Sequence, residues 1–195
     1  MNFETLVKAV KANRPKVVAW LISKEGGDIN PSTKDNEAIQ LAAGNGRLEV
    51  VKELLLNDPR VDPSALYNDA IQLAAGNGRL EVVKLLLNDP RVDPSAGNNY
   101  AIQWASESGH VEVVKVLLND PRVEPNADNN YALRKAIKNG HTEVVELLRA
   151  HQKEKSKEQT KKLTKTETIK IDLNSIKNIT YTTKDNKQMM IITCK

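Results

Sequence analysis

One stretch of the sequence occurs several times, and this repetition limits the possible fold more than any other feature. Residues 70–88 read AIQLAAGNGRLEVVKLLLN, and close copies begin at Ala38, Ala101 and Ala132. A glycine stands in the middle of each copy, at Gly46, Gly78, Gly109 and Gly140. The spacings between these glycines are 32, 31 and 31 residues. A chain that repeats at this interval is expected to stack similar units, each burying its apolar face against the next.

Each copy is predicted to form two short helices joined by a tight turn. Within residues 70–88, Ile71, Ala74 and Ala75 make a narrow apolar face, and valine and leucine then recur at helical spacing after the turn. The central glycine acts as a hinge, because it adopts the positive φ of a tight reversal at little steric cost. A pair of such helices leaves one apolar face uncovered, so it requires a neighbour of the same kind.

A fainter copy lies upstream in residues 6–21, with Asn13 at the hinge, so that five units span residues 1–150. A period of about 33 residues with two helices and a turn resembles the ankyrin-repeat family. The segment GHVEVVKVLL at residues 109–118 is close to the family's G-H-x-E-V-V-K-L-L-L pattern. The resemblance implies an all-α solenoid. The family's TPLHxAA opening is altered to A-I-Q-x-A, with glutamine in place of histidine at Gln40, Gln72 and Gln103.

These glutamines are expected to join the backbones of adjacent units, because a primary amide both donates and accepts hydrogen bonds. In the fifth unit Arg134 takes this position and Lys135 follows it. Charge there indicates that the array ends at the fifth unit, since a terminal repeat needs a polar outer face.

The connecting loops repeat as well, reading NDPRVDPS at residues 57–64 and 88–95 and NDPRVEPN at residues 119–126. Two prolines in each loop restrict the backbone. The valine of each loop is expected to be buried beneath it, at Val61, Val92 and Val123. Loops of this type resemble those of ankyrin-repeat proteins from giant viruses and amoebae. That resemblance implies a host-interaction role and, for a viral protein, the host-cell cytoplasm.

The remaining residues differ in composition from the array. Residues 1–149 hold 18 Lys and Arg against 20 Asp and Glu, whereas residues 150–195 hold 11 against 5. Residues 151–167 are expected to continue the last helix by a turn or two and then form a charged, solvated linker. Residues 168–195 alternate as strands do around a turn at residues 184–187, which predicts a β-hairpin, a set of three short strands or a disordered tail.

No pattern in the sequence predicts an enzyme, a cofactor or a metal site. Phosphate-binding loops, dinucleotide fingerprints and metalloprotease motifs are absent from it. His110 and His141 follow hinge glycines and are interpreted as structural. Asp89 and Asp93 form a carboxylate pair within one loop, but a calcium site needs more oxygen ligands, so turn bonding is the better interpretation. The single cysteine favours a reducing, intracellular location, cytoplasmic or nuclear, and no secretory signal or membrane span is predicted.

The resemblance implies recognition of another protein through the concave face, which is made of the loop tips and the first helices. At these positions the copies differ, and four of the seven aromatic residues of the chain map to this face: Tyr67, Tyr100, Trp104 and Tyr131. Tyrosine and tryptophan dominate protein interfaces. Binding is expected to centre on Tyr100, Trp104 and Tyr131. The charged rim is expected to comprise Glu107, Lys135 and Lys138.

Two other functions compete with this interpretation. The basic tail could bind nucleic acid or another acidic surface, in which case affinity should fall steeply with salt. Some viral ankyrin-repeat proteins are ubiquitin-ligase adaptors with F-box-like C-terminal segments. The tail of this chain lacks the leucine- and proline-rich helical pattern of such segments.

Overall fold

The computed structural model describes residues 2–164, 176–184 and 187–194. The chain divides into two compact parts, residues 1–154 and 155–195, and each is described by itself. The helices are α1 (Phe3–Lys11), α2 (Pro15–Ile22), α3 (Thr33–Gly44), α4 (Leu48–Asn57), α5 (Ala65–Gly76), α6 (Leu80–Leu87), α7 (Ala96–Glu107), α8 (Val111–Leu118), α9 (Ala127–Lys138) and α10 (Thr142–Thr164).

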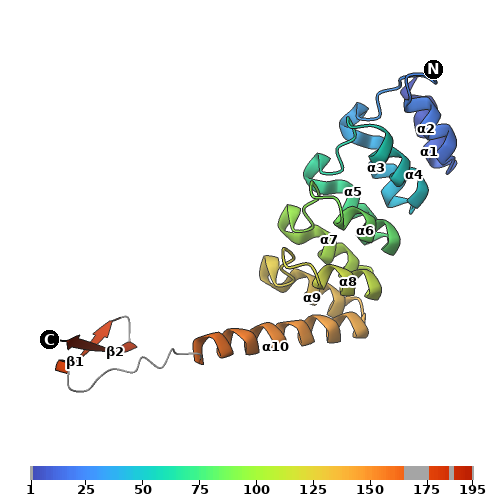
Figure 1. The fold of residues 1–195 in the computed structure, drawn as a ribbon. Coiled ribbons are helices and arrows are strands. Elements are labelled where there is room, and N and C mark those ends of the chain that lie inside the picture. The colour runs from blue at the N-terminus through green and yellow to red at the C-terminus, as the bar shows by residue number, and fades with distance from the viewer. Residues whose placement is uncertain (1, 165–175, 185–186, 195) are drawn as a thin grey trace. The chain divides into compact units, whose positions relative to one another are not determined.

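These helices form consecutive antiparallel pairs that stack in a row, as Figure 1 shows for the array. We number the pairs as units, from unit 1 (α1 and α2) to unit 5 (α9 and α10). First helices pack against the first helices of neighbouring units, and second helices pack against second helices. The all-α solenoid predicted from the repeat is therefore confirmed.

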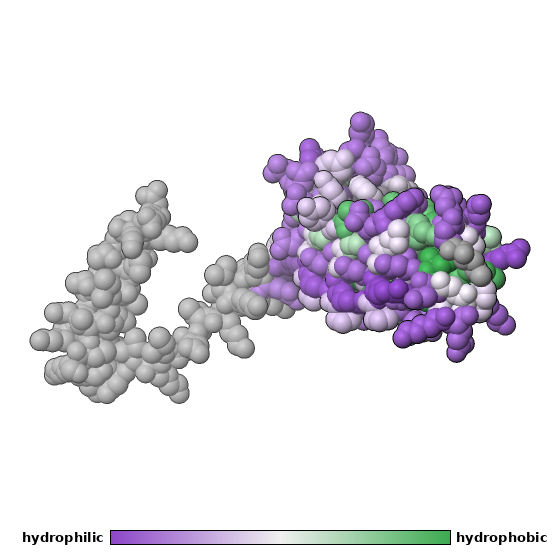
Figure 2. Space-filling view, turned by 90° about the horizontal axis from the view of Figure 1, so that it is seen from above, coloured by the Kyte–Doolittle hydropathy of each residue, from purple (hydrophilic) through white to green (hydrophobic). Residues whose placement is uncertain are grey.

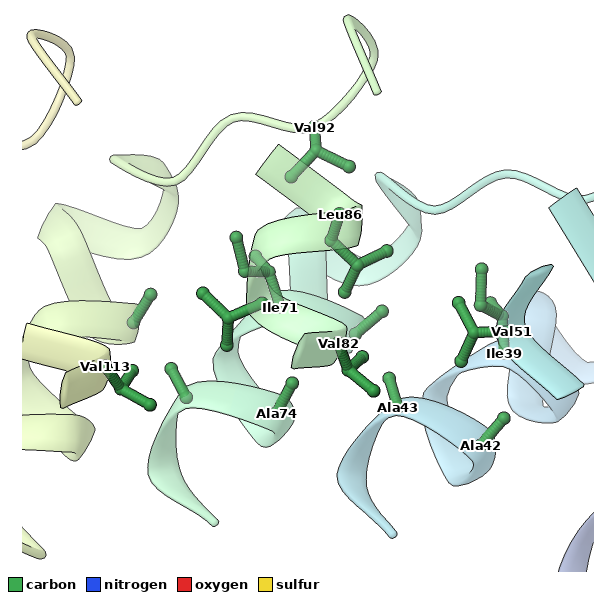
Figure 3. Close-up of a cluster of buried hydrophobic side chains, with 14 of the residues drawn as sticks. Ile39, Ala42, Ala43, Val51, Ile71, Ala74, Val82, Leu86, Val92 and Val113 are labelled. Carbon is green, nitrogen blue, oxygen red and sulfur yellow. The ribbon is translucent and has the colours of Figure 1, made fainter. Parts of the chain in front are cut away.

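The core of the array runs continuously through the stacked units (Figure 3). Each internal unit buries an isoleucine of its first helix, such as Ile39 or Ile71, against valine and leucine of its second helix. Alanines such as Ala42 and Ala74 are fully buried where the first helices approach one another. The loop valines Val61, Val92 and Val123 are each 1% exposed, as the sequence predicts.

The last unit differs from the internal ones at the position that would face a further unit. Ala43, Ala75 and Ser106 hold this position in units 2 to 4 and are fully buried, whereas unit 5 has Ile137, which is 51% exposed. A side chain of this size would keep a sixth first helix from approaching as closely as its predecessors do. Together with Arg134 and Lys135 on the same helix, it favours an array that ends here.

The opposite end of the array also presents apolar side chains. Val17 and Trp20 on α2 are 40% and 48% exposed. Figure 2 looks toward this end from above and shows a mostly hydrophilic surface in which hydrophobic residues gather in one area. Val50, the counterpart of Val17 in unit 2, is fully buried because unit 1 covers it.

The C-terminal residues contain a longer helix than the sequence predicts, followed by a hairpin. α10 continues through Thr164, well beyond the turn or two expected after residue 150. The strands β1 (Ile176–Lys184) and β2 (Lys187–Cys194) pair antiparallel, from Lys184 opposite Lys187 to Ile176 opposite Cys194. Of the predicted alternatives, the hairpin is the one present. A third strand, expected from the alternation in residues 168–173, falls outside the described residues.

Candidate protein interface

In units 2 to 5 the first helix opens with a short left-handed turn, which we call the tip of the unit. Three consecutive residues have φ between 50° and 68° in every tip: residues 34–36, 66–68, 97–99 and 128–130. The tips follow one another along one side of the array (Figure 1). Because residues with a Cβ adopt this conformation at a cost of roughly 1–2 kcal/mol each, other contacts must hold the tips in place.

The glutamines of the A-I-Q motif provide one such contact, and it is not the contact that the sequence predicts. Gln72 Nε2 donates to the carbonyl of Tyr67 at 2.5 Å, and Gln103 Nε2 donates to that of Asn98 at 2.6 Å. Gln40 makes the same bond to Asp35 at 2.7 Å. The expectation that these amides join adjacent units was therefore wrong. Each one fastens the tip of its own unit, because the left-handed turn brings a tip carbonyl within reach of the following helix.

An asparagine at the third position of each tip makes the connection between units. Asn68 Oδ1 accepts a hydrogen bond from the backbone N–H of Asp93 at 2.8 Å, and Asn99 Oδ1 accepts one from Glu124 at 2.7 Å. Asn36 does the same for Asp62. Sequence reasoning missed this role. The available signal was the recurrence of asparagine two residues before each A-I-Q or A-L-R motif, combined with its tolerance of positive φ.

At the last tip, α10 supplies the missing partner. Among the described residues, no Asp-Pro-Arg loop follows Asn130, and Gln152 Nε2 donates to its Oδ1 at 2.9 Å. The same amide donates to Asn126 Oδ1 at 2.7 Å. The helix that continues past residue 150 therefore closes the series of tip contacts.

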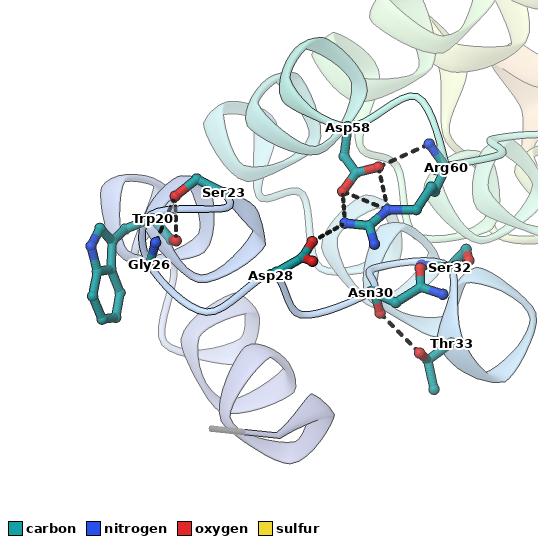
Figure 4. A network of polar contacts seen from close by, with 9 residues as sticks. All are labelled: Trp20, Ser23, Gly26, Asp28, Asn30, Ser32, Thr33, Asp58 and Arg60. Atoms are coloured by element: carbon teal, nitrogen blue, oxygen red, sulfur yellow. Dashed lines mark hydrogen bonds and ion pairs between the residues drawn. The ribbon is translucent and has the colours of Figure 1, made fainter.

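The Asp-Pro-Arg loops form a second ladder along the array. In the loop after unit 3, Asp89 accepts hydrogen bonds from the backbone and the guanidinium of Arg91, which also donates to the carbonyl of Val61 at 2.8 Å. Arg122 repeats this pattern with Asp120 and Val92. At the first loop, Arg60 bonds to Asp58 and reaches Asp28 at 3.3 Å instead (Figure 4). The loop aspartates thus order turns, as the sequence predicts.

This ladder predicts a specific pH dependence of stability. The hydrogen bond from the Arg122 guanidinium lowers the pKa of Asp120 below its usual value. The contribution of the Asp120 carboxylate to the free energy of unfolding is therefore complete above about pH 4, the pKa of aspartate in an unfolded chain. It is lost as the pH falls through the lower pKa that Asp120 has in the folded protein. Asp120→Asn is expected to cost about 1–2 kcal/mol at pH 7 and progressively less below pH 4. Urea unfolding at a series of pH values measures this gap, and a constant gap would contradict the prediction.

The residue after each hinge glycine connects the second helices to the preceding unit. His110 Nε2 lies 3.0 Å from the carbonyl oxygen of Gly76, and His141 Nε2 lies 2.9 Å from that of Glu107. Arg79 donates to Gly44 in the same way at 3.3 Å. The geometry supports the structural interpretation of both histidines. Within the part of the chain that the structure describes, no group of three His, Cys, Asp or Glu residues is placed to hold a metal ion.

An apolar groove lies between the tips of units 3 and 4. It has a volume of about 340 Å³ and is lined by Leu66, Tyr67, Gln72, Gly97, Tyr100 and Trp104, and we call it the aromatic groove. The rings of Tyr100 and Trp104 stack with centroids 5.7 Å apart and planes 10° from parallel. Tyr67 is 81% exposed and Tyr100 is 42% exposed. Three of the four aromatic residues assigned to the concave face thus meet at one groove.

The other predicted site residues lie toward unit 5 and do not line this groove. Tyr131 is covered by cations, with Lys135 Nζ 5.0 Å and the Arg134 guanidinium carbon 5.7 Å from its ring centroid. Lys135 also pairs with Glu107 at 2.7 Å across the two units, and this hydrogen bond raises the pKa of Lys135. Lys138 is exposed. The centre expected at Tyr100, Trp104 and Tyr131 is therefore divided into an aromatic groove and a charged cluster.

Comparison with known families agrees with the stacked helix pairs. A family model described as ankyrin repeats (three copies) matches residues 6–97 and again residues 71–161. The chain belongs to the ankyrin-repeat family. Ankyrin repeats are generally protein–protein interaction modules. A comparison with curated proteins finds no match. Among the described residues of this ankyrin-repeat chain, no helix has the length and apolar character needed to cross a membrane.

Proposed function

We propose that this ankyrin-repeat chain is a non-enzymatic scaffold that binds another protein through its concave face, with the aromatic groove as the centre of recognition. The observation that supports this proposal most directly is the tip of unit 3. Leu66 and Tyr67 have φ of 51° and 58° and are 52% and 81% exposed. The structure thus holds two large apolar residues in a strained conformation and in contact with water. Strained backbone conformations of this kind are found most often at functional sites, including ligand-binding sites.

The other tips support this proposal by contrast. The corresponding pairs are Lys34-Asp35, Gly97-Asn98 and Asp128-Asn129, all polar or small. The internal units have the same architecture at their tips, so the fold does not require leucine and tyrosine at the tip of unit 3. Leu66, Tyr67 and Tyr100 are three of the seven large hydrophobic side chains that are exposed among the described residues, and all three line the aromatic groove. Exposed apolar residues that gather in this way mark interaction sites.

Tyr67→Asn tests this proposal, because asparagine occupies the same tip position in units 4 and 5. The variant is expected to melt at the same temperature as the parent or slightly higher. It should bind a protein partner about thirtyfold more weakly, as expected for an interface anchor worth about 2 kcal/mol. Parent and variant are used as baits in a cell extract, and the captured proteins are quantified and then titrated individually.

Leu56→Gln is the matched control, since Leu56 on α4 is 81% exposed, as Tyr67 is, but does not line the groove. Partners should be retained by this control and lost by Tyr67→Asn. Specific partners that bind Tyr67→Asn as well as the parent would refute the proposal. If their capture also fell steeply with salt, recognition would belong to the basic tail.

A further inference from the structure

Asp69, on the first helix of unit 3, is a carboxylate with no cation paired to it among the residues whose side chains the structure describes. It begins the helical part of α5, directly after the tip at residues 66–68, and its side chain is partly buried. Among the residues whose side chains the structure describes, none forms an ion pair or hydrogen bond with it. Burial raises the pKa of Asp69, because desolvation penalises the charged form. Glu37, which holds the same position in unit 2, does have a partner, Lys34 at 3.5 Å.

The position of Asp69 places it beside the aromatic groove. Its counterpart in unit 4 is Tyr100, which lines the groove. Equivalent positions of these two units lie next to one another, as a second, shallow pocket shows: Leu73 and Trp104 line it together, as do Asn77 and Ser108. Asp69 is one helical turn before Leu73 on the same face of α5. This register places Asp69 next to Tyr100 at the edge of the groove, outside the set of residues that line it.

The charge on the other side of the groove is already balanced. Lys135 pairs with Glu107 at 2.7 Å and also lies over the ring of Tyr131. The first helices of units 3 and 4 thus present one apolar groove. The unpaired carboxylate of Asp69 lies at its edge on the unit 3 side, and the ion pair of Lys135 with Glu107 lies toward unit 5. A partner that is complementary to this surface carries a positive charge next to an apolar side chain.

We propose that the aromatic groove binds a protein segment in which an arginine lies close to a large apolar residue. The apolar side chain occupies the groove between Tyr67 and Trp104, and the guanidinium pairs with Asp69. Arginine suits this place better than lysine, because its planar group bonds a carboxylate through two N–H groups and also stacks on an aromatic ring such as that of Tyr100. This inference rests on the proposed function and assigns the chemistry of the partner.

A library of random 12-residue peptides displayed on phage tests the inference, with the full chain as the target. Selection is expected to enrich peptides that carry arginine within a few residues of leucine, phenylalanine or tryptophan. Individual synthetic peptides should lose about tenfold or more in affinity for Asp69→Asn. They should keep their affinity for Asp128→Asn, which removes an exposed acid from the tip of unit 5.

A double-mutant cycle then identifies the contact. Once the peptide's arginine is changed to glutamine, Asp69→Asn should cause almost no further loss of affinity. This inference would be overturned by peptides that bind Tyr67→Asn less tightly but either contain no arginine or bind Asp69→Asn as tightly as the parent. Such peptides would still support the proposed function. Peptides that bind Tyr67→Asn as well as the parent would overturn both, and so would a selection that enriches nothing over a target-free control.

Discussion

Replacing Asn99 by alanine is expected to lower the free energy of unfolding by about 2–4 kcal/mol, because two separate penalties add. Asn99 is 6% exposed and has a φ of 68°. Alanine is less tolerant of this left-handed conformation, which costs on the order of 1 kcal/mol. The change also removes the acceptor for the Glu124 N–H. This contact is partly buried, and a donor left without a partner there costs about 1–3 kcal/mol.

Asn98→Ala separates these two penalties. Asn98 precedes Asn99 in the same tip, has a φ of 58° and is exposed, and the structure gives its side chain no hydrogen bond. This control should therefore lose only about 1 kcal/mol, from the left-handed conformation alone. Urea denaturation followed by circular dichroism measures both variants. Equal losses for Asn98→Ala and Asn99→Ala would show that the side-chain bond between tip and loop contributes nothing to stability.

The repeat made most of the array predictable from the sequence. Hinge glycines at a regular interval and apolar residues at helical spacing determine which faces are buried, because each unit can cover its core only with a neighbour. For the same reason the burial of Val61, Val92 and Val123 could be predicted. These inferences depend on averages over several copies, so an irregularity in a single copy affects them little.

The conformation of the tips could not be predicted in the same way. In the tips of units 2 and 3, the pairs Lys34-Asp35 and Leu66-Tyr67 do not signal three consecutive residues of positive φ, and asparagine at the third position is the one residue common to all four tips. Without the left-handed turn, the partner of Gln72 could not be identified, because its acceptor is a carbonyl that this turn places beside α5. The glutamines were therefore assigned to the wrong contact.

The sequence predicted which residues belong to the candidate interface better than it predicted how those residues are arranged. The sequence identifies the aromatic residues of the concave face, but it does not show that cations of its own helix cover Tyr131. Nor does it show that Tyr67 reaches the groove of Tyr100 and Trp104 from the preceding tip. The length of α10 was underestimated, because residues 151–164 lack an apolar face. Lysine, glutamate and glutamine nevertheless have high intrinsic helix propensity.

The hinge glycines offer a comparison in which backbone conformation is constant and only the neighbouring unit varies. Gly109 and Gly140 both have a φ of 76°. A Cβ added at Gly109 would lie 2.6 Å from Nδ1 of His141, whereas nothing lies within 4 Å of a Cβ added at Gly140. Gly140→Ala is therefore expected to cost only the left-handed penalty of about 1 kcal/mol.

Gly109→Ala should cost about 2–4 kcal/mol, because the added methyl group displaces the imidazole of His141 and breaks its hydrogen bond to the Glu107 carbonyl. Gly46→Ala should fall between the two. Its Cβ would lie 2.8 Å from Arg79 Cδ, in a flexible side chain that can move aside more easily than a ring. Chemical denaturation of the three variants measures this order.

The comparison of Gly109→Ala with Gly140→Ala requires that unit 5 unfolds in the same transition as the rest of the array. Leu148→Ala tests this requirement. Leu148 is fully buried, so its truncation should cost about 2–5 kcal/mol and be visible in the main transition. If it is visible, a small loss for Gly140→Ala cannot be attributed to local fraying of the last unit. If Gly109→Ala and Gly140→Ala lowered the free energy of unfolding equally, the contact of His141 with the preceding unit would contribute nothing to stability. The hinge glycines would in that case be required for their backbone conformation alone.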